Sequence, residues 1–127
     1  MRRFFILLAC IAALVVACEN PDSAFIGSPD ASARGNEVAV TLTDFSIEME
    51  LSPRAGITTF VVTNDGAVEH SFAVVGGAID SRFDEPLAPG ETRALTTDLD
   101  PGTYDVFCPI GDHRQRGMAT SIQAIGP

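Results

Sequence analysis

The chain of 127 residues can hold one domain and little else. It carries 17 Asp and Glu residues against 8 Lys and Arg residues, which gives a formal net charge of −9. This balance argues against a nucleic-acid-binding protein, because such proteins need a positive surface. It also predicts repulsion from anionic lipid, so we expect any attachment to a membrane to be covalent.

Residues 1–17 begin with two arginines after the initiator methionine and continue as an almost unbroken apolar run. This pattern predicts a secretory signal peptide, and the run is too short to favour a membrane-spanning helix. It ends in V-V-A-C at positions 15–18, which resembles a bacterial lipobox, the signal whose cysteine becomes the lipidated first residue of the mature protein. The alternative is an ordinary signal peptide that contains a cysteine. We expect an exported protein in the periplasm or at the extracytoplasmic face of a membrane, anchored through lipid on Cys18.

The rest of the chain divides into a tether over residues 18–36 and one domain over residues 37–127. Most of the tether is rich in Ser, Ala, Pro, Asp and Gly and lacks periodicity, which is typical of a flexible segment. Cys10 would leave with the signal peptide, so Cys108 would be the only thiol in the folded domain. An intramolecular disulfide is then impossible, and a metal thiolate is a good role for Cys108 in an exported protein.

From Glu37 onward the apolar residues recur with a period of two, and residues 45–51 give a clear half-buried strand. Further strands are predicted at Ile57–Thr63, Val68–Val75, Thr92–Leu99, Thr103–Cys108 and Ala119–Ile125. The stretch Ala78–Gly90 is the least regular, and we expect a loop or one helical turn there. About seven or eight short strands separated by turns predict an all-β protein with a β-sandwich architecture.

Four potential metal ligands stand in a distinctive pattern. His70 lies on the apolar parity of the predicted strand 68–75, while Cys108, His113 and Met118 follow one another at intervals of five positions. Two imidazoles, one thiolate and one thioether are the donors of a trigonal His2Cys copper site with a weak axial methionine. The soft sulfurs favour copper over magnesium or calcium. The chain has two histidines, and both belong to this pattern.

Cys-x4-His-x4-Met with an upstream histidine resembles the ligand pattern of the cupredoxin family, the small blue-copper proteins that include plastocyanin, azurin and rusticyanin. The likeness covers residues 37–127, and the ligand loop has the longer spacings of the rusticyanin-like branch. The resemblance implies a Greek-key β-sandwich that holds one type 1 copper ion and transfers one electron between Cu(I) and Cu(II). The resemblance does not require an oligomer, so we expect a monomer.

Each proposed ligand has an ordinary structural interpretation when it is taken alone. His70 could be a hydrogen-bonded core histidine, and Cys108 could be a small buried hydrophobe. Met118 could fill space in the core, and His113 could be a loop residue. The presence of all four in the family's order favours a metal site over these alternatives.

Two residues beside the ligands are candidates for tuning the metal. Ser71 stands where many family members have an asparagine that braces the site. Ile110 keeps a backbone N–H that could bond the Cys108 sulfur, whereas Pro109 has none.

The family geometry also implies routes for electrons. His113 would be the ligand at the exposed edge, framed by Ile110 as the main electron port, and Phe107 would lie on a second route. Arg114 and Arg116 flank His113. They are either solvated loop residues or a docking site for an acidic partner.

The leading hypothesis is therefore a membrane-tethered electron shuttle that exchanges electrons with donor and acceptor proteins and is not an enzyme. Copper nitrite reductases and multicopper oxidases need several more histidines than this chain has. The alternative is copper binding for storage or delivery without an electron-transfer role. Four intact ligands argue against a metal-free structural domain.

Overall fold

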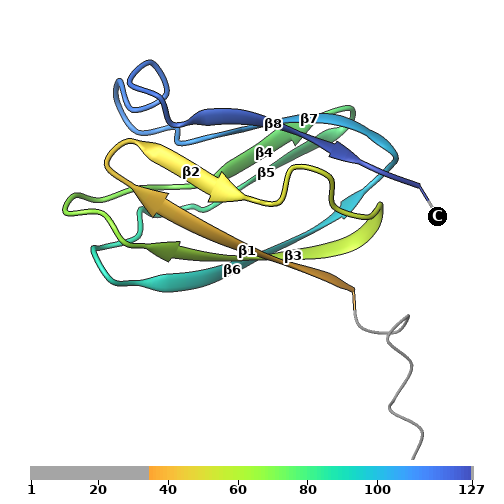
Figure 1. Ribbon diagram of the computed structural model, residues 1–127, viewed down its shortest axis with the longest axis horizontal. Coiled ribbons are helices and arrows are strands. Elements are labelled where there is room, and N and C mark those ends of the chain that lie inside the picture. Colours follow the sequence, from red (N-terminus) through yellow and green to blue (C-terminus); the bar gives the residue numbers. More distant parts are fainter. Residues whose placement is uncertain (1–34, 127) are drawn as a thin grey trace, which may run out of the picture.

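The computed structural model describes residues 35–126, so the predicted signal peptide, the anchor Cys18 and nearly all of the tether lie outside the described residues. Within 35–126 the structure is all-β, as predicted, and its two sheets form the layers of a sandwich (Figure 1). The strands are β1 (Asn36–Thr43), β2 (Ser46–Met49), β3 (Gly56–Asn64), β4 (Ala73–Gly76), β5 (Ile79–Arg82), β6 (Thr92–Leu99), β7 (Gly102–Phe107) and β8 (Ala119–Ala124).

One sheet has the order β2-β1-β3-β6 and the other has the order β5-β4-β7-β8. β1 and β3 pair in parallel, and the other neighbouring strands pair antiparallel. The inward parity of each long strand supplies the core, for example Val38, Val40 and Leu42 of β1. In this part of the chain no helix is long and apolar enough to span a bilayer.

The alternating run that follows Glu37 forms a hairpin. Asp44 and Phe45 make the turn between β1 and β2, and Leu42 pairs with Ile47 across it. The apolar parity changes at this turn, from even positions before it to odd positions after it. The hairpin thereby brings a carboxylate and an aromatic ring to one end of the sandwich.

Two of the predicted segments were wrong in detail. The strand predicted at Val68–Val75 begins only at Ala73, because His70 makes a single isolated bridge with Leu87 and Val68 is exposed. The predicted alternation also fails here, since the successive residues His70 and Ser71 are both buried. The irregular stretch 78–90 contains β5, a strand rather than only a loop or a helical turn.

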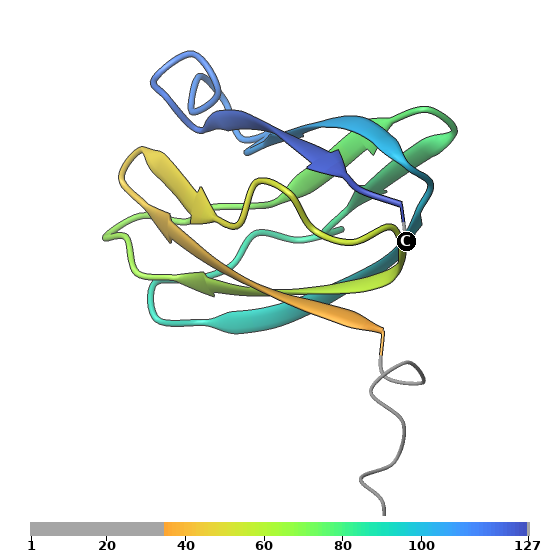
Figure 2. The ribbon, with the colours of Figure 1, turned by 45° about the vertical axis from the view of Figure 1, so that its right-hand side comes forward.

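Three segments meet at the end of the sandwich where β1, β3 and β7 finish. They are the β1–β2 turn, the loop of residues 65–72 that follows β3, and the loop of residues 108–118 that follows β7 (left-hand end of Figure 1). Figure 2 shows the same gathering from another side. The sheet topology therefore brings His70 and the Cys108 loop together from distant parts of the sequence.

Candidate metal centre

Three of the four predicted ligands form one cluster at this end of the fold. A donor atom from each of His70, Cys108 and His113 lies within 4.8 Å of the other two. The Nδ1 atoms of the two histidines are 3.3 Å apart, and the Cys108 sulfur is 3.6 Å from His113 Nδ1. The predicted convergence of two imidazoles and one thiol is therefore present in the structure.

The loop of residues 108–118 is folded back on itself by its own main chain. The Cys108 N–H donates to the Met118 carbonyl at 3.1 Å, and the Met118 N–H donates to the His113 carbonyl at 3.1 Å. The His113 N–H donates in turn to the Ile110 carbonyl at 3.0 Å. These bonds hold the first, middle and last candidate ligands of the loop close together.

Two glycines permit this path. Gly111 and Gly117 have φ values of 48° and 124°, in the region that other residues rarely adopt. A Cβ on Gly117 would lie 2.9 Å from the Phe45 carbonyl oxygen, so the loop passes close to the β1–β2 turn at this point.

His70 reaches the cluster from the loop after β3. Its main chain is fixed by reciprocal bonds with Leu87, at 3.2 Å from the His70 N–H and 2.7 Å to the His70 carbonyl. The buried Asn64 side chain braces the same region by donating to the carbonyls of Val68 and Leu87, both at 2.9 Å. His70 itself is fully buried.

Asp44 was not among the residues predicted for the site, yet its Oδ1 lies 2.7 Å from His70 Nε2. Its Oδ2 accepts a hydrogen bond from the Ala67 N–H at 2.9 Å. The signal available in the sequence was the change of apolar parity between Leu42 and Phe45, which marks a turn with an aspartate in it. That signal locates the turn but gives no contact with His70.

The Cys108 sulfur accepts a hydrogen bond from the main-chain N–H of Ser71 at 3.3 Å. Ser71 therefore touches the ligand set, through its backbone. Ile110 contributes its carbonyl to His113, and its suggested N–H bond to the Cys108 sulfur stays a prediction. Met118 is fully buried in the core beside Cys108, and its role as an axial ligand also stays a prediction.

The surroundings of His113 favour the neutral form of its imidazole. Burial is the main cause that lowers the pKa of His113, and the neighbouring His70 lowers it further. A neutral imidazole keeps a lone pair for a metal ion. The pKa of Asp44 is also lowered, first by the hydrogen bond from Ala67 and then by the bond with His70, which keeps this carboxylate ionised.

Two aromatic rings near the cluster each carry an arginine. The Phe45 ring packs edge-on against His113 at 4.8 Å and His70 at 5.9 Å between centroids. The guanidinium carbon of Arg116 lies 3.3 Å from the centre of the Phe45 ring, and that of Arg114 lies 4.2 Å from the centre of the Phe107 ring. Both arginines are exposed, so they rest on the protein's own aromatic rings while facing solvent.

The donor set fits a borderline or soft metal ion. Two imidazole nitrogens and one thiol sulfur, with a buried methionine in the same loop, suit copper and disfavour the hard ions magnesium and calcium. His70, Cys108 and His113 would hold the ion, with Met118 as the fourth candidate.

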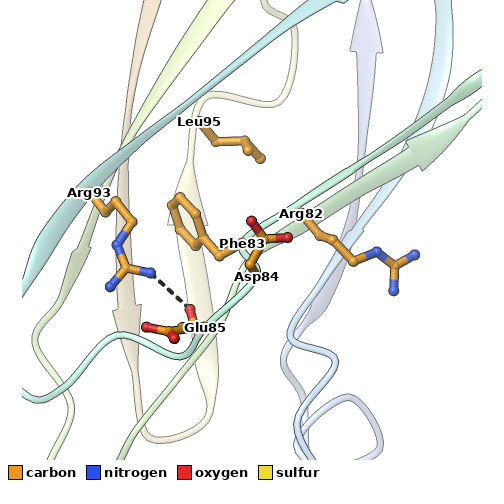
Figure 3. A pocket seen from close by; sticks show the side chains of 6 residues that line it. All are labelled: Arg82, Phe83, Asp84, Glu85, Arg93 and Leu95. Atoms are coloured by element: carbon orange, nitrogen blue, oxygen red, sulfur yellow. Dashed lines mark hydrogen bonds between the residues drawn. The ribbon is translucent and has the colours of Figure 1, made fainter.

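A separate hollow lies beside β5 and β6, and Figure 3 shows the side chains that line it. Its lining residues are Arg82, Phe83, Asp84, Glu85, Arg93 and Leu95. Arg93 donates to the Glu85 carbonyl at 2.9 Å and also pairs with Glu91, while Arg82 pairs with Asp80. Both arginines are thus engaged within the protein, and the hollow shares no residue with the metal cluster.

The fold is found in solved structures of auracyanins. A dithionite-reduced auracyanin from the photosynthetic bacterium Roseiflexus castenholzii aligns with a TM-score of 0.61 and 17% identity, over 72% of this chain and 98% of that one. Auracyanin B aligns with a TM-score of 0.60 and 18% identity, over 71% of this chain and 88% of that one. At these identities the likeness shows the fold, and the chain has the cupredoxin fold.

The chain is also similar in sequence to components of an iron uptake system. The iron uptake system component EfeO of Escherichia coli K12 and that of Shigella flexneri are both 32% identical over 94 residues, which is 69% of this chain. The chain spans about a quarter of the length of these relatives, since the match covers 25% of each. No protein-family model matches the sequence.

Proposed function

We propose that this chain, which has the cupredoxin fold, is a type 1 copper protein that shuttles single electrons at the outside of a membrane. The observation that carries the proposal is the convergence of His70, Cys108 and His113 within 4.8 Å at one end of the sandwich. Bound copper would supply a centre that cycles between Cu(I) and Cu(II). The likeness to a dithionite-reduced auracyanin supports this role.

The protein's own contribution is a rigid and mostly dry site. His70, Cys108 and Met118 are between 0% and 1% exposed, so water has little access to three of the candidate ligands. The main-chain bonds of the 108–118 loop and the Asn64 contacts limit the movement of the ligands. Ligands that stay in place between oxidation states keep the reorganisation energy of electron transfer low.

His113 is the candidate port for electrons, because it is only half-buried whereas the other ligands are fully buried. Ile110 packs against the core next to it, and Phe107 directly precedes Cys108. Arg114 and Arg116 would present positive charge around this port to an acidic redox partner. The chain would act as a monomer between a donor and an acceptor.

An extracytoplasmic location is supported by the likeness to the EfeO component and to the auracyanins. Cleavage before Cys18 and lipidation of that residue would tether the domain to the membrane. With both histidines already in one cluster, the chain lacks the additional histidines that multicopper enzymes use. We therefore propose electron transfer without catalysis.

The likeness to an iron uptake system component favours a second candidate, metal capture or delivery for an uptake system. The two functions differ in metal exchange. An electron shuttle should keep its ion through repeated reduction and oxidation, whereas a delivery protein should release it to a competing chelator in one oxidation state.

The test of the proposed function is a visible absorption spectrum of the purified protein after addition of one equivalent of Cu(II). A thiolate bonded to Cu(II) should give an intense charge-transfer band that a mild reductant bleaches and reoxidation restores. A colourless protein would exclude the type 1 site. The same titration with Fe(III) would then examine the uptake function.

A further inference from the structure

His70 is held between the cluster and a carboxylate. One ring nitrogen, Nδ1, lies 3.3 Å from His113 Nδ1, and the other, Nε2, lies 2.7 Å from Asp44 Oδ1. The His70 side chain is fully buried, while 30% of the Asp44 side chain is exposed. The carboxylate therefore stands between solvent and the far edge of a buried ring.

An ionised carboxylate only accepts hydrogen bonds, so the His70 Nε2 that faces Asp44 Oδ1 must carry a proton. In the Nε2–H tautomer the Nδ1 atom keeps its lone pair, on the side of Cys108 and His113. We propose that Asp44 is a positioning residue that fixes His70 in the Nε2–H tautomer and turns its Nδ1 toward the metal. The proposal rests on the metal site of the proposed function.

The surrounding turn is built around this pair. A Cβ on Gly66 would collide with Asp44 Oδ1 and lie 2.7 Å from His70 Nε2, so only glycine leaves room for the contact. The Gly66 N–H is fixed by Asn64 Oδ1 at 2.9 Å. Gly66 has no positive φ angle, so the space around the pair is the reason for a glycine at this position.

Both oxygens of the carboxylate are used, which makes an amide a poor substitute. Oδ2 accepts from the Ala67 N–H at 2.9 Å while Oδ1 faces His70. An asparagine side chain has one acceptor oxygen and one NH2 donor group. If its oxygen serves Ala67, its NH2 group faces His70 Nε2 and drives the ring to the Nδ1–H tautomer, with a proton where the metal should bind.

The test is Asp44→Asn, measured in two ways on the purified protein. Cu(II) affinity, determined by competition with a chelator, should fall about 10- to 100-fold, the usual effect of losing a partner of a ligating histidine. Nitrogen-15 NMR of the metal-free protein should show His70 moving from the Nε2–H to the Nδ1–H tautomer. Circular dichroism should show an unchanged fold.

Asp65→Asn is the matched control. It removes one carboxylate from the same end of the molecule, and within residues 35–126 the Asp65 side chain has no hydrogen bond. Its Cu(II) affinity and its His70 tautomer should stay as in the parent protein. A similar loss of affinity in both variants would assign the effect to net charge and overturn the positioning role.

Gly66→Ala separates the pair while keeping both partners. It should lower Cu(II) affinity in the same direction as Asp44→Asn, whereas Gly102→Ala, with open space around its Cβ position, should have no effect. Should both Asp44→Asn and Gly66→Ala bind Cu(II) within about twofold of the parent with His70 still in the Nε2–H form, the proposal is wrong.

The tautomer measurement needs no metal, so it separates this proposal from the proposed function. A parent protein without the charge-transfer band but with an Asp44-dependent Nε2–H tautomer would refute type 1 copper and keep the positioning role. A charge-transfer band together with an Asp44-independent tautomer would support type 1 copper and refute the positioning role of Asp44.

Discussion

Cys108 and His113 are positioned by the main chain of their own loop, whereas His70 is positioned by residues outside its own loop. The loop closes through backbone bonds between Cys108, Met118 and His113. The position of His70 depends on Leu87, on Asp44, which directly follows β1, and on Asn64, which ends β3. The Cys108 and His113 part of the site is therefore formed within one loop. The His70 part forms only once the sheet has assembled.

The largest single effect is expected for a substitution in the 108–118 loop. Cys108→Ser should abolish the visible charge-transfer band, because a serine hydroxyl is neither soft nor ionised at neutral pH. Its similar volume should preserve the fold, which circular dichroism checks. Met49→Leu, a volume-conserving change at a half-buried methionine outside the cluster, should leave the band intact. A full-strength band in Cys108→Ser would mean that another group binds the copper.

A large effect on stability is expected for a substitution among the residues that hold His70. Asn64→Ala removes the donor to the Val68 and Leu87 carbonyls from a fully buried position. The free energy of unfolding should fall by about 2–4 kcal/mol, since buried polar groups lose their partners. Thr63→Ala, which removes one hydroxyl of the exposed Thr63–Thr92 hydrogen bond, should cost less than about 1 kcal/mol. Urea denaturation of both variants checks this, and equal costs would contradict the role of Asn64.

A smaller effect distinguishes two glycines of the ligand loop. Gly117→Ala combines a φ of 124° with a close approach to the Phe45 carbonyl, so it should lower stability by about 1–3 kcal/mol and weaken Cu(II) binding by displacing Met118. Gly111→Ala has open space and a φ of 48°, and should cost about 1 kcal/mol with little change in binding. Thermal melts and chelator competition measure both. The opposite ranking would contradict the packing of the loop against the β1–β2 turn.

The smallest effect is expected for Arg116, which lies over the Phe45 ring. Arg116→Ala removes the guanidinium from the Phe45 ring and should lower stability by about 0.5–1 kcal/mol with the charge-transfer band unchanged. If Arg116 also docks an acidic partner, electron transfer to such a partner should slow and lose part of its salt dependence. Stopped-flow kinetics at two ionic strengths test this, and an unchanged rate would leave Arg116 a structural role only.

The same contrast explains how much the sequence could reveal. The spacing of Cys108, His113 and Met118 is a local pattern, so the loop could be identified without knowledge of the fold. The strands were predicted from alternation, which held for β1 and β7 and failed at 68–72, where tertiary packing buries Ser71 and Phe72 in succession. Asp44 meets His70 only because β1 and β3 pair in parallel and end together, and no local pattern encodes that register.

The most direct test of the central claim is cyclic voltammetry of the copper-loaded protein. An electron shuttle predicts one reversible one-electron couple that persists over many cycles in the presence of a competing chelator, with the visible band restored at each oxidation. Loss of the couple after the first reduction, with copper transferred to the chelator, would contradict the account and assign the chain to metal delivery.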